Sequence, residues 1–385
     1  MTTKQPSATP GETDGAVSDR RKFLGTLAAG AGAATLLAGL GASPPASAQQ
    51  AAGQPPPAPG GRPPLPPEPK ASQPPPLSDV KGKTVYVTAA SDGIGLGIAR
   101  ACSNAGMNVV IGYRNEQRLA AALPLFPKGA PVFPVKHDVV GREGWVQLLE
   151  AVKGKYGKLH VVVNNAGIKT FAKASEATPE VWQNSVDVDL GAIFHSVAVV
   201  LPHMKEHNEG GHFVATSSMS GLLPAVTAGV YTTLKFAVVG IMEALRIELE
   251  STNIGTSVFC PGGVATDNYL GSGEENPYLK ELAKNRPPPP PLPDGRPRPN
   301  FGAALMSPLE AGERVVNGIR NNDLFILSHT EFKDGMMERF NAILTSCPDE
   351  PPPAERFPIE LRTRHTGIYP REIAHRLEKR STYRG

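Results

Sequence analysis

Three side chains in one stretch of the chain have the types and spacing needed to exchange a proton with an alcohol or carbonyl oxygen. Ser218 precedes Tyr231, and Lys235 follows that tyrosine by four positions. Positions i and i+4 share a helix face, so the Lys235 ammonium can lie beside the phenol of Tyr231. A phenol titrates at about 10, and a nearby cation favours the phenolate; a drop of two units corresponds to about 2.7 kcal/mol. Found alone, Tyr-x-x-x-Lys is usually a chance surface pattern.

A second group of residues is typical of a phosphate-binding turn. The β-branched run Thr84–Thr88 is followed by a glycine-rich turn, residues 89–97, and then by a helical pattern. In a βα unit of this kind, glycines let the backbone approach a pyrophosphate, and the helix N-terminus supplies amide donors. The strand–turn–helix context makes this signal stronger than glycines alone.

The next apolar run, Asn108–Gly112, leads into Arg114 rather than an acidic residue. An acidic side chain there would accept hydrogen bonds from the adenosine ribose and select NAD. The guanidinium of Arg114 suits a 2′-phosphate instead, so the sequence favours NADP over NAD. The alternative is that Arg114 caps a solvated helix start beside Glu116.

Short apolar runs alternate with helical patterns from Lys83 onward. This alternation predicts an α/β fold of three layers, a Rossmann-like doubly wound parallel sheet in a single domain. The further strands are expected at residues 159–163, 211–216, 256–259 and 324–327.

With these motifs in place, residues 79–330 resemble the short-chain dehydrogenase/reductase family. Thr88–Gly95 resembles its glycine-rich turn, Asp138-Val139 its adenine pair, Asn164–Gly167 its Asn-Asn-Ala-Gly motif and Pro261–Thr266 its nicotinamide segment. The resemblance implies cofactor contacts from Thr88, Ser91, Asp92, Gly93, Ile94, Gly95, Arg114, Asp138, Val139, Asn165, Ala166, Gly167, Tyr231, Lys235, Pro261, Gly262, Val264 and Thr266.

The resemblance also implies catalytic roles. Tyr231 would be the general acid/base, Lys235 would favour its phenolate and bind the nicotinamide ribose, and Ser218 would steady the substrate oxygen. With Ser218 and Tyr231, Asn268 and Tyr269 are the expected substrate contacts. A small alcohol or carbonyl compound is the expected substrate, and no metal is implied.

Two residues depart from the family pattern. Ala89 stands at the place of the first glycine, so we expect an ordinary L-residue conformation there, tolerated because Gly93 and Gly95 remain. Asp189 stands at the catalytic set's asparagine position, where it could keep the backbone contact but add a negative charge near Lys235.

The first 48 residues resemble a bacterial twin-arginine export signal. Arg20 and Arg21 precede a stretch rich in Gly, Ala and Leu, and Ala46–Ala48 supplies an Ala-x-Ala cleavage pattern. We therefore expect recognition by the twin-arginine machinery and a periplasmic or secreted protein. A membrane anchor left uncut is the alternative.

The remaining segments lie around the catalytic domain. Residues 49–78 are dense in Pro, Gly, Ala and Gln, which predicts an extended linker. Residues 267–307 form a long proline-rich connection, either a substrate lid or a rigid surface spacer. Residues 331–385 are expected to hold one helix, Glu331–Leu344, and a charged tail, which loosely resembles that of bacterial dehydrogenases of bulky aryl alcohols.

The net charge, the cysteines and the histidines argue against nucleic-acid binding, a disulfide framework and a metal site, respectively. A net charge of +3 gives no indication of nucleic-acid binding. Three cysteines form no recognisable disulfide framework, and Cys102 is expected to be a buried small hydrophobe. His203 and His207 have metal-ligand spacing, but the sequence shows no third ligand, so a solvated helix terminus is favoured.

Two predicted helices, Leu190–Leu201 and Phe236–Leu249, are apolar nearly all round, which predicts a homodimer or homotetramer.

Taken together, the sequence predicts an NADP(H)-dependent oxidoreductase interconverting a secondary alcohol and a ketone (or aldehyde). The alternative is a catalytically weak NADP-binding regulator or scaffold of the same fold, which Asp189 and Ala89 keep open.

Overall fold

The structure is a computed structural model that describes residues 73–170, 172–225, 228–266, 305–351, 353, 355–356 and 366–382. The predicted export signal, most of the predicted linker and nearly all of the predicted lid lie outside the described residues.

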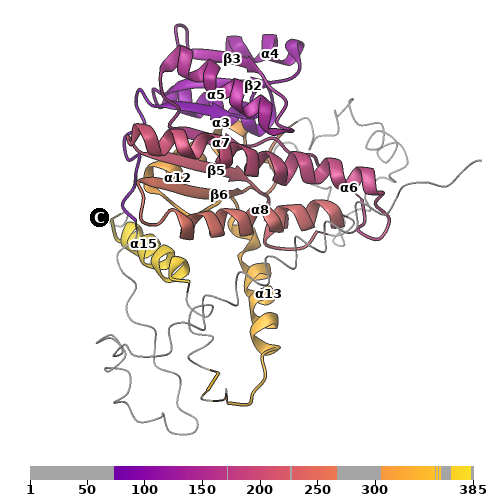
Figure 1. Cartoon of the computed structure of the whole chain (residues 1–385). Helices are drawn as coiled ribbons and strands as arrows, with labels where there is room; N and C mark the ends of the chain where they lie inside the picture. Colours follow the sequence, from indigo (N-terminus) through magenta and orange to yellow (C-terminus); the bar gives the residue numbers. More distant parts are fainter. Residues whose placement is uncertain are drawn as a thin grey trace, which may run out of the picture. The chain divides into compact units, whose positions relative to one another are not determined.

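A seven-stranded parallel sheet in the order β3-β2-β1-β4-β5-β6-β7 forms the centre of the domain (Figure 1). The order reverses direction between β1 and β4, which is the doubly wound arrangement that the sequence predicted. Ligands in such sheets bind where strand order reverses, at the carboxyl ends of the strands. The strands are β1 Thr84–Val87, β2 Asn108–Tyr113, β3 Val132–Lys136, β4 Val161–Asn164, β5 Gly211–Thr216, β6 Ile254–Cys260 and β7 Phe325–Leu327.

Helices cover both faces of the sheet (Figure 1). α3, α4 and α12 contribute to the core on one face, and α5, α7 and α8 to the core on the other. The helices are α3 Gly93–Asn104, α4 Glu116–Ala122, η2 Leu123–Leu125, α5 Arg142–Tyr156, α6 Pro179–Val186, η3 Asp187–Gly191, α7 Ala192–His207, η4 Met219–Gly221, α8 Gly229–Glu248, α12 Pro308–Asn321, η5 Thr330–Phe332, α13 Lys333–Thr345 and α15 Ile368–Thr382.

The alternation of side chains in β1 divides the core into two layers. Val85 and Val87 belong to the layer under α3 and α12, whereas Tyr86 belongs to the layer under α5 and α7. All three side chains are fully buried, as expected for a central strand covered on both faces. Trp145 packs edge-on against Tyr86, with ring centroids 5.7 Å apart.

The folded domain begins before the predicted boundary at residue 79. The side chain of Gln73 donates to the carbonyl oxygen of Thr252 at 2.6 Å, and Leu77 is buried. The end of the segment predicted as a linker is therefore part of the fold. Its anchors are one amide and one leucine, too few to stand out in a proline-rich sequence.

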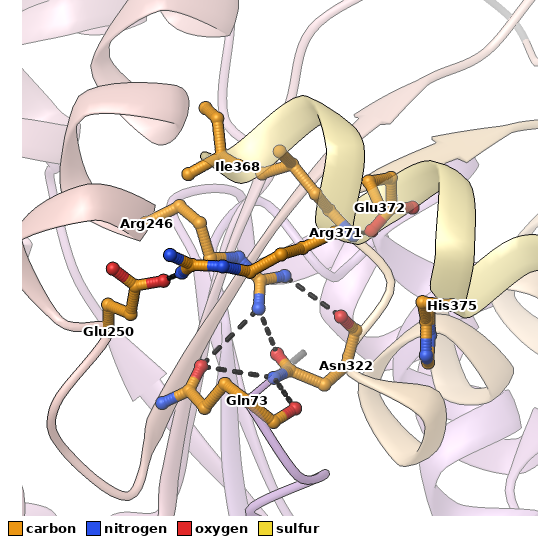
Figure 2. Close-up of a pocket in the computed structure, with 9 residues that line it drawn as sticks. Gln73, Arg246, Glu250, Asn322, Ile368, Arg371, Glu372 and His375 are labelled. Atoms are coloured by element: carbon orange, nitrogen blue, oxygen red, sulfur yellow. Dashed lines mark hydrogen bonds and ion pairs between the residues drawn. The ribbon is translucent and has the colours of Figure 1, made fainter. Parts of the chain in front are cut away.

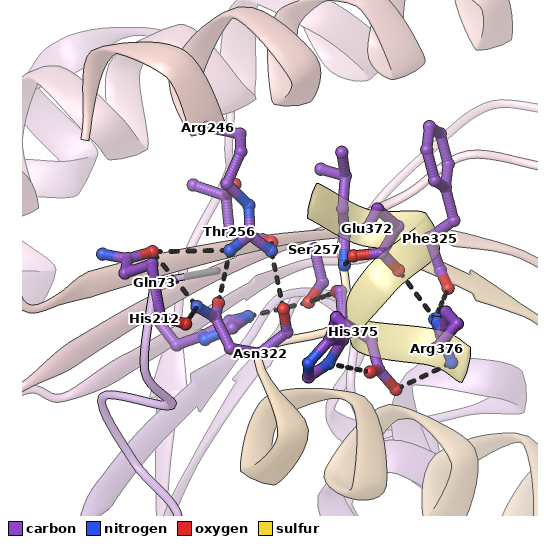
Figure 3. A network of polar contacts seen from close by, with 12 residues as sticks. Gln73, His212, Arg246, Thr256, Ser257, Asn322, Phe325, Glu372, His375 and Arg376 are labelled. Atoms are coloured by element: carbon purple, nitrogen blue, oxygen red, sulfur yellow. Dashed lines mark hydrogen bonds and ion pairs between the residues drawn. The ribbon is translucent and has the colours of Figure 1, made fainter. Parts of the chain in front are cut away.

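The C-terminal tail contains a helix, α15, that the sequence analysis did not predict. It lies beside α8 and the start of β7 (Figures 2 and 3). Asp323 accepts a hydrogen bond from His375 at 2.9 Å and pairs with Arg376 at 3.0 Å, while Arg371 pairs with Glu250. The contacts that hold α15 are made by charged side chains. A helix is predicted from regularly spaced apolar residues, so this one was not recognised.

The predicted solvated helix end at His203 and His207 is wrong for His203. His203 is buried at 9 % exposure, and its Nε2 accepts a hydrogen bond from the amide of Leu159 at 3.1 Å. His207 lies beside it and contacts the carbonyl oxygen of Leu159 at 3.1 Å. The two rings thus provide hydrogen-bond partners for the backbone amide and carbonyl groups of Leu159, just before β4. Among the described residues, no group of three potential metal ligands lies together.

The helical run from α6 through η3 to α7, residues 179–207, has the length and mean hydropathy, 1.4, of a membrane span. Buried residues of α7, such as Val200 and Met204, lie in the core beside the sheet. A core helix of a globular domain passes the same test, so this run has a packing explanation.

Candidate active site

Thr88, at the end of β1, ties the glycine-rich turn to the loop after β4. Its Oγ1 accepts hydrogen bonds from the amides of Asn165 and Ala166 at 2.8 and 2.7 Å. Two of the predicted cofactor segments, far apart in sequence, therefore meet where strand order reverses.

Ala89 adopts a left-handed conformation, with φ of +49°, so the expected ordinary L-residue conformation is wrong. The chain keeps the backbone path that a glycine would take, at a cost of about 1–2 kcal/mol for an L-residue. The reason is the tight packing beyond it: a Cβ atom on Gly95 would lie 2.3 Å from the carbonyl oxygen of Ala89.

The N-terminus of α3 faces the place where a pyrophosphate binds in such folds. Asp92 caps the helix by accepting from the amide of Gly93 at 2.6 Å. Gly93 has φ of +53°, and a Cβ atom on it would contact Thr266 at 3.2 Å. The first-turn amides of a helix have no partner within it. The glycine backbone and these amides fit a dinucleotide phosphate, with Ser91 and Ile94 flanking them in sequence.

Two arginine–aspartate pairs lie near the carboxyl end of β2 and the start of α3. Arg114 lies 3.9 Å from Asp138, and both side chains are mostly exposed. Arg118 donates to Asp92 at 2.8 Å, a contact that the sequence analysis missed. Val139 is buried, and its carbonyl oxygen accepts from Trp145 at 3.1 Å.

Lys235 lies inside the domain, close to Tyr231. Its Nζ atom is 5.4 Å from the centroid of the Tyr231 ring, and α8 carries both residues as predicted. The carbonyl oxygen of Thr216 accepts from Nζ at 3.2 Å. Lys235 is 4 % exposed, whereas Tyr231 is partly exposed.

Asp189 lies directly against Lys235. Its Oδ1 is 2.8 Å from Nζ of the lysine, and its Oδ2 accepts from the amide of Ile168 at 2.9 Å. Burial is the largest single influence and disfavours the ammonium, but Asp189, Tyr231 and Cys260 together favour it, so the pKa of Lys235 lies above its ordinary value. The side chain of Asp189 thus holds the amide of Ile168 and places a carboxylate beside the lysine.

The ion pair fits because Gly167 makes room for it. A Cβ atom on Gly167 would lie 2.9 Å from Oδ1 of Asp189 and 3.1 Å from Nζ of Lys235. The Asn165–Gly167 segment therefore lies between the glycine-rich turn and the candidate catalytic lysine.

Ser218 and Ser217 have different surroundings. Ser218 is partly exposed and caps η4 through a hydrogen bond from the amide of Ser220 at 3.1 Å. Ser217 is buried and donates to the carbonyl oxygen of Lys235 at 2.8 Å. Ser217, which sequence reasoning did not single out, thus fastens the end of β5 to α8 beside the site.

The Pro261–Thr266 segment continues from β6 along the same edge of the sheet. The carbonyl oxygen of Pro261 accepts from the amide of Met219 at 2.9 Å, which joins this segment to the Ser218 turn. Gly262 donates to His329 at 3.1 Å, and a Cβ atom on Gly262 would meet that ring at 2.7 Å. Val264 is buried. Asn268 and Tyr269 lie outside the described residues.

The chain matches the family described as short chain dehydrogenase over residues 83–276, about half of its length. It belongs to the short-chain dehydrogenase family. Membership makes it a nicotinamide-dependent oxidoreductase acting on CH–OH groups.

Two relatives and a solved structure extend this match. A C alpha-dehydrogenase from Sphingobium sp. is 24 % identical over 287 residues, covering 70 % of this chain and 88 % of the relative. A 3beta-hydroxysteroid dehydrogenase 2 from Eggerthella lenta is 30 % identical over 205 residues, covering 53 % and 78 %. A short chain dehydrogenase/reductase from Burkholderia phymatum in complex with NAD has a TM-score of 0.61 at 25 % identity, covering 72 % and 99 %.

Proposed function

We propose that this short-chain dehydrogenase is an NADP(H)-dependent oxidoreductase that interconverts a secondary alcohol and a ketone (or aldehyde), with Tyr231 as the general acid/base. The observation that supports this is the juxtaposition of Tyr231 and Lys235 on α8, with Nζ 5.4 Å from the ring centroid. The Asn165–Gly167 segment adjoins the same lysine, so the cofactor-binding motifs and the proton-exchanging side chains share one end of the sheet.

When bound, the nicotinamide would supply the hydride chemistry at the substrate carbon. In the reductive direction, the Tyr231 hydroxyl gives its proton to the carbonyl oxygen, and the hydroxyl of Ser218 donates a hydrogen bond to that oxygen. Oxidation reverses these steps, so the phenolate of Tyr231 takes the alcohol proton. Lys235 would stabilise the phenolate and hold the ribose of a bound nicotinamide.

The decisive comparison is between Tyr231→Phe and wild type in cofactor turnover with a panel of alcohols and ketones. Loss of turnover by at least about a hundredfold is expected, since general acid–base catalysis contributes at least that factor. Tyr369→Phe is the matched control, because that hydroxyl donates to Glu243 on the surface at 3.2 Å. Equal rates for wild type and Tyr231→Phe would favour the regulator or scaffold alternative.

The preference for NADP rests on Arg114, whose side chain is 75 % exposed at the carboxyl end of β2. A guanidinium there presents paired donors to a 2′-phosphate, and Asp138 is near enough to orient it. NADP affinity of Arg114→Ala, measured by titration calorimetry, is expected to fall about tenfold with little change for NAD. Arg314→Ala, which breaks a surface pair with Glu310, is the control. An equal loss for both cofactors would contradict the preference.

The substrate class is a bulky secondary alcohol or its ketone. One relative is named a 3beta-hydroxysteroid dehydrogenase, and another a C alpha-dehydrogenase. A 3β-hydroxysteroid and an aryl secondary alcohol therefore belong in the first panel. Turnover confined to short aliphatic alcohols would contradict this class.

The enzyme assembles as a homodimer or homotetramer through α7 and α8. Phe194 on α7 is 59 % exposed and Ile247 on α8 is 44 % exposed, so apolar surface remains on both helices. Light scattering on the purified protein tests this. A monomer at micromolar concentration would contradict it.

Export by the twin-arginine route, with cleavage before Gln49, completes the proposal. Fractionation of cells that express the full chain should place it in the periplasm or medium. Changing Arg20 and Arg21 to lysines should retain it in the cytoplasm. Recovery of the uncut chain in the membrane fraction would support the anchored alternative.

A further inference from the structure

The candidate catalytic lysine of this chain has a carboxylate partner instead of the amide expected at that position. Nζ of Lys235 and Oδ1 of Asp189 are 2.8 Å apart, and their side chains are 5 % and 0 % exposed. At such burial an ion pair is screened little by salt or water. The Asp189 carboxylate therefore affects the charge of Lys235 strongly.

Packing holds the geometry of this pair on several sides. The amide of Ile168 donates to Oδ2 of Asp189 at 2.9 Å, which leaves Oδ1 directed at the lysine. The carbonyl oxygen of Thr216 takes a second donor of Nζ at 3.2 Å. An ammonium has three donors, so one remains for the Tyr231 and ribose side of the site.

The titratable and charged groups around Lys235 come from three elements. η3 contributes Asp189, α8 contributes Tyr231, and the end of β6 contributes Cys260. Burial raises the pKa of the Cys260 thiol to about 12, so it is uncharged at neutral pH. Lys169, next to Ile168 in the chain, is a cation of the loop after β4, and burial lowers its pKa.

We propose that Asp189 is a positioning residue whose carboxylate compensates the charge of Lys235 and thereby shifts proton exchange at Tyr231 to higher pH than an amide would. A lone ammonium stabilises the phenolate strongly, whereas a neutral ion pair stabilises it less. Carbonyl reduction consumes the phenol form of Tyr231, so compensation of the lysine charge favours that direction. This inference rests on the proposed function. The Asp189–Lys235 pair would favour the rate of carbonyl reduction over that of alcohol oxidation.

The size of the effect follows from Coulomb's law. A unit charge about 6–10 Å away, at an effective dielectric constant of about 20, moves a titration by about one to two units. The acid limb of the alcohol-oxidation profile is therefore expected at least about one pH unit lower in Asp189→Asn. At a pH on that limb, oxidation by the variant is faster than by wild type by about tenfold.

The experiment compares pH profiles of kcat/KM for alcohol oxidation in wild type, Asp189→Asn and two further variants. Asp189→Glu keeps the charge and is expected to restore the position of the wild-type limb. Asp187→Asn removes a carboxylate from the same turn, where Asp187 accepts from Gln183 at 2.8 Å, and is expected to leave the limb in place. Superimposable profiles for wild type and Asp189→Asn would overturn the proposal.

A second readout needs no turnover. The raised pKa of Lys235 means that its share of stability is present below the ordinary lysine pKa and is lost as pH rises through the higher folded value. In Asp189→Asn the carboxylate no longer raises that pKa, so Lys235 loses less stabilisation as the pH rises. The alkaline fall in melting temperature should then be shallower than in wild type, and an unchanged fall would overturn the ion pair.

These two readouts separate the inference from the proposed function. If Tyr231→Phe keeps full turnover but the alkaline fall in melting temperature is shallower in Asp189→Asn, the proposed function fails and the ion pair stands. If Asp189→Asn does not fold, Asp189→Ser removes the same charge and leaves room for a water. An inactive but folded neutral variant with intact cofactor binding would overturn the shift in pH range.

Discussion

Gly97 of α3 and Gly312 of α12 lie so close that a Cβ atom on Gly312 would come within 2.3 Å of the carbonyl oxygen of Gly97. A Cβ atom on Gly97 would in turn lie 1.9 Å from the carbonyl oxygen of Pro308. These approaches are to backbone atoms, which cannot turn aside. The glycine contact therefore sets the position of α3, the helix whose N-terminus lies at the candidate cofactor site.

Gly312→Ala is expected to destabilise the protein by about 1–3 kcal/mol, because the added methyl group forces the two helices apart. Urea denaturation measures the change. Gly240→Ala is the matched control, since that helical glycine has no atom within 4 Å of an added Cβ. The control should be neutral or stabilising by up to about 1 kcal/mol. An equal response of the two variants would contradict the close packing of α3 against α12.

Ala89→Gly is expected to stabilise the protein by about 0.5–1 kcal/mol. Relief of the left-handed strain at φ of +49° exceeds the added freedom of glycine in the unfolded chain. Ala90→Gly, at the next and fully buried position, should destabilise it instead. A loss of stability in Ala89→Gly would show that the strain is absent in solution.

Asp323→Asn is expected to loosen α15, because it removes the charge that holds His375 at 2.9 Å and Arg376 at 3.0 Å (Figure 3). Charge-assisted hydrogen bonds of this kind contribute about 1.5–3 kcal/mol each. Limited trypsin digestion should cut the tail of the variant faster than that of wild type. Asp334→Asn, at an exposed position of α13, should leave the rate unchanged. Identical rates for Asp323→Asn and wild type would mean that other contacts hold α15.

Stability is expected to fall as the pH drops from about 6.5 toward 4. Burial lowers the pKa of His212 to about 3, and those of His137 and His160 to about 4. The folded state therefore binds fewer protons than the unfolded chain in this window, so unfolding free energy rises with pH. Each histidine contributes a slope of up to about 1.4 kcal/mol per pH unit.

Denaturation at several pH values measures this slope, and His212→Gln should reduce it. Nε2 of His212 contacts Oγ of Ser257 at 2.8 Å, and a glutamine amide can keep one such contact. A variant slope equal to that of wild type would exclude His212 as a source.

Six strands of the sheet could be predicted from sequence because each carries its own signal. The edge strand β3, Val132–Lys136, was not predicted, and Pro134 interrupts its apolar run. Val85, Val109 and Val161 lie in short β-branched runs bounded by turn residues, and they stand opposite one another in the register of the sheet. The Tyr231–Lys235 pair was equally accessible, since helical geometry places positions four apart on one face. These predictions depend only on residues that are close together in the sequence.

The sequence analysis was wrong where distant packing overrides a local preference. The φ of Ala89 is set by the contact with Gly95, and His203 is buried because the chain entering β4 needs its ring nitrogen. Leu159, the partner of His203, is 44 positions away in the chain, and the close approach of Gly95 to Ala89 depends on how the turn folds. Arg118 and Ser217 escaped notice for the same reason.

The amino-acid sequence by itself determined the fold class and the residue types available for hydride and proton transfer, because strand and helix periods and motif spacing are local properties. Only the tertiary structure decided that Asp189 pairs with Lys235, that Asp92 pairs with Arg118, and that α15 docks through Asp323. The partner of a charged side chain depends on which residues distant in the chain are buried beside it.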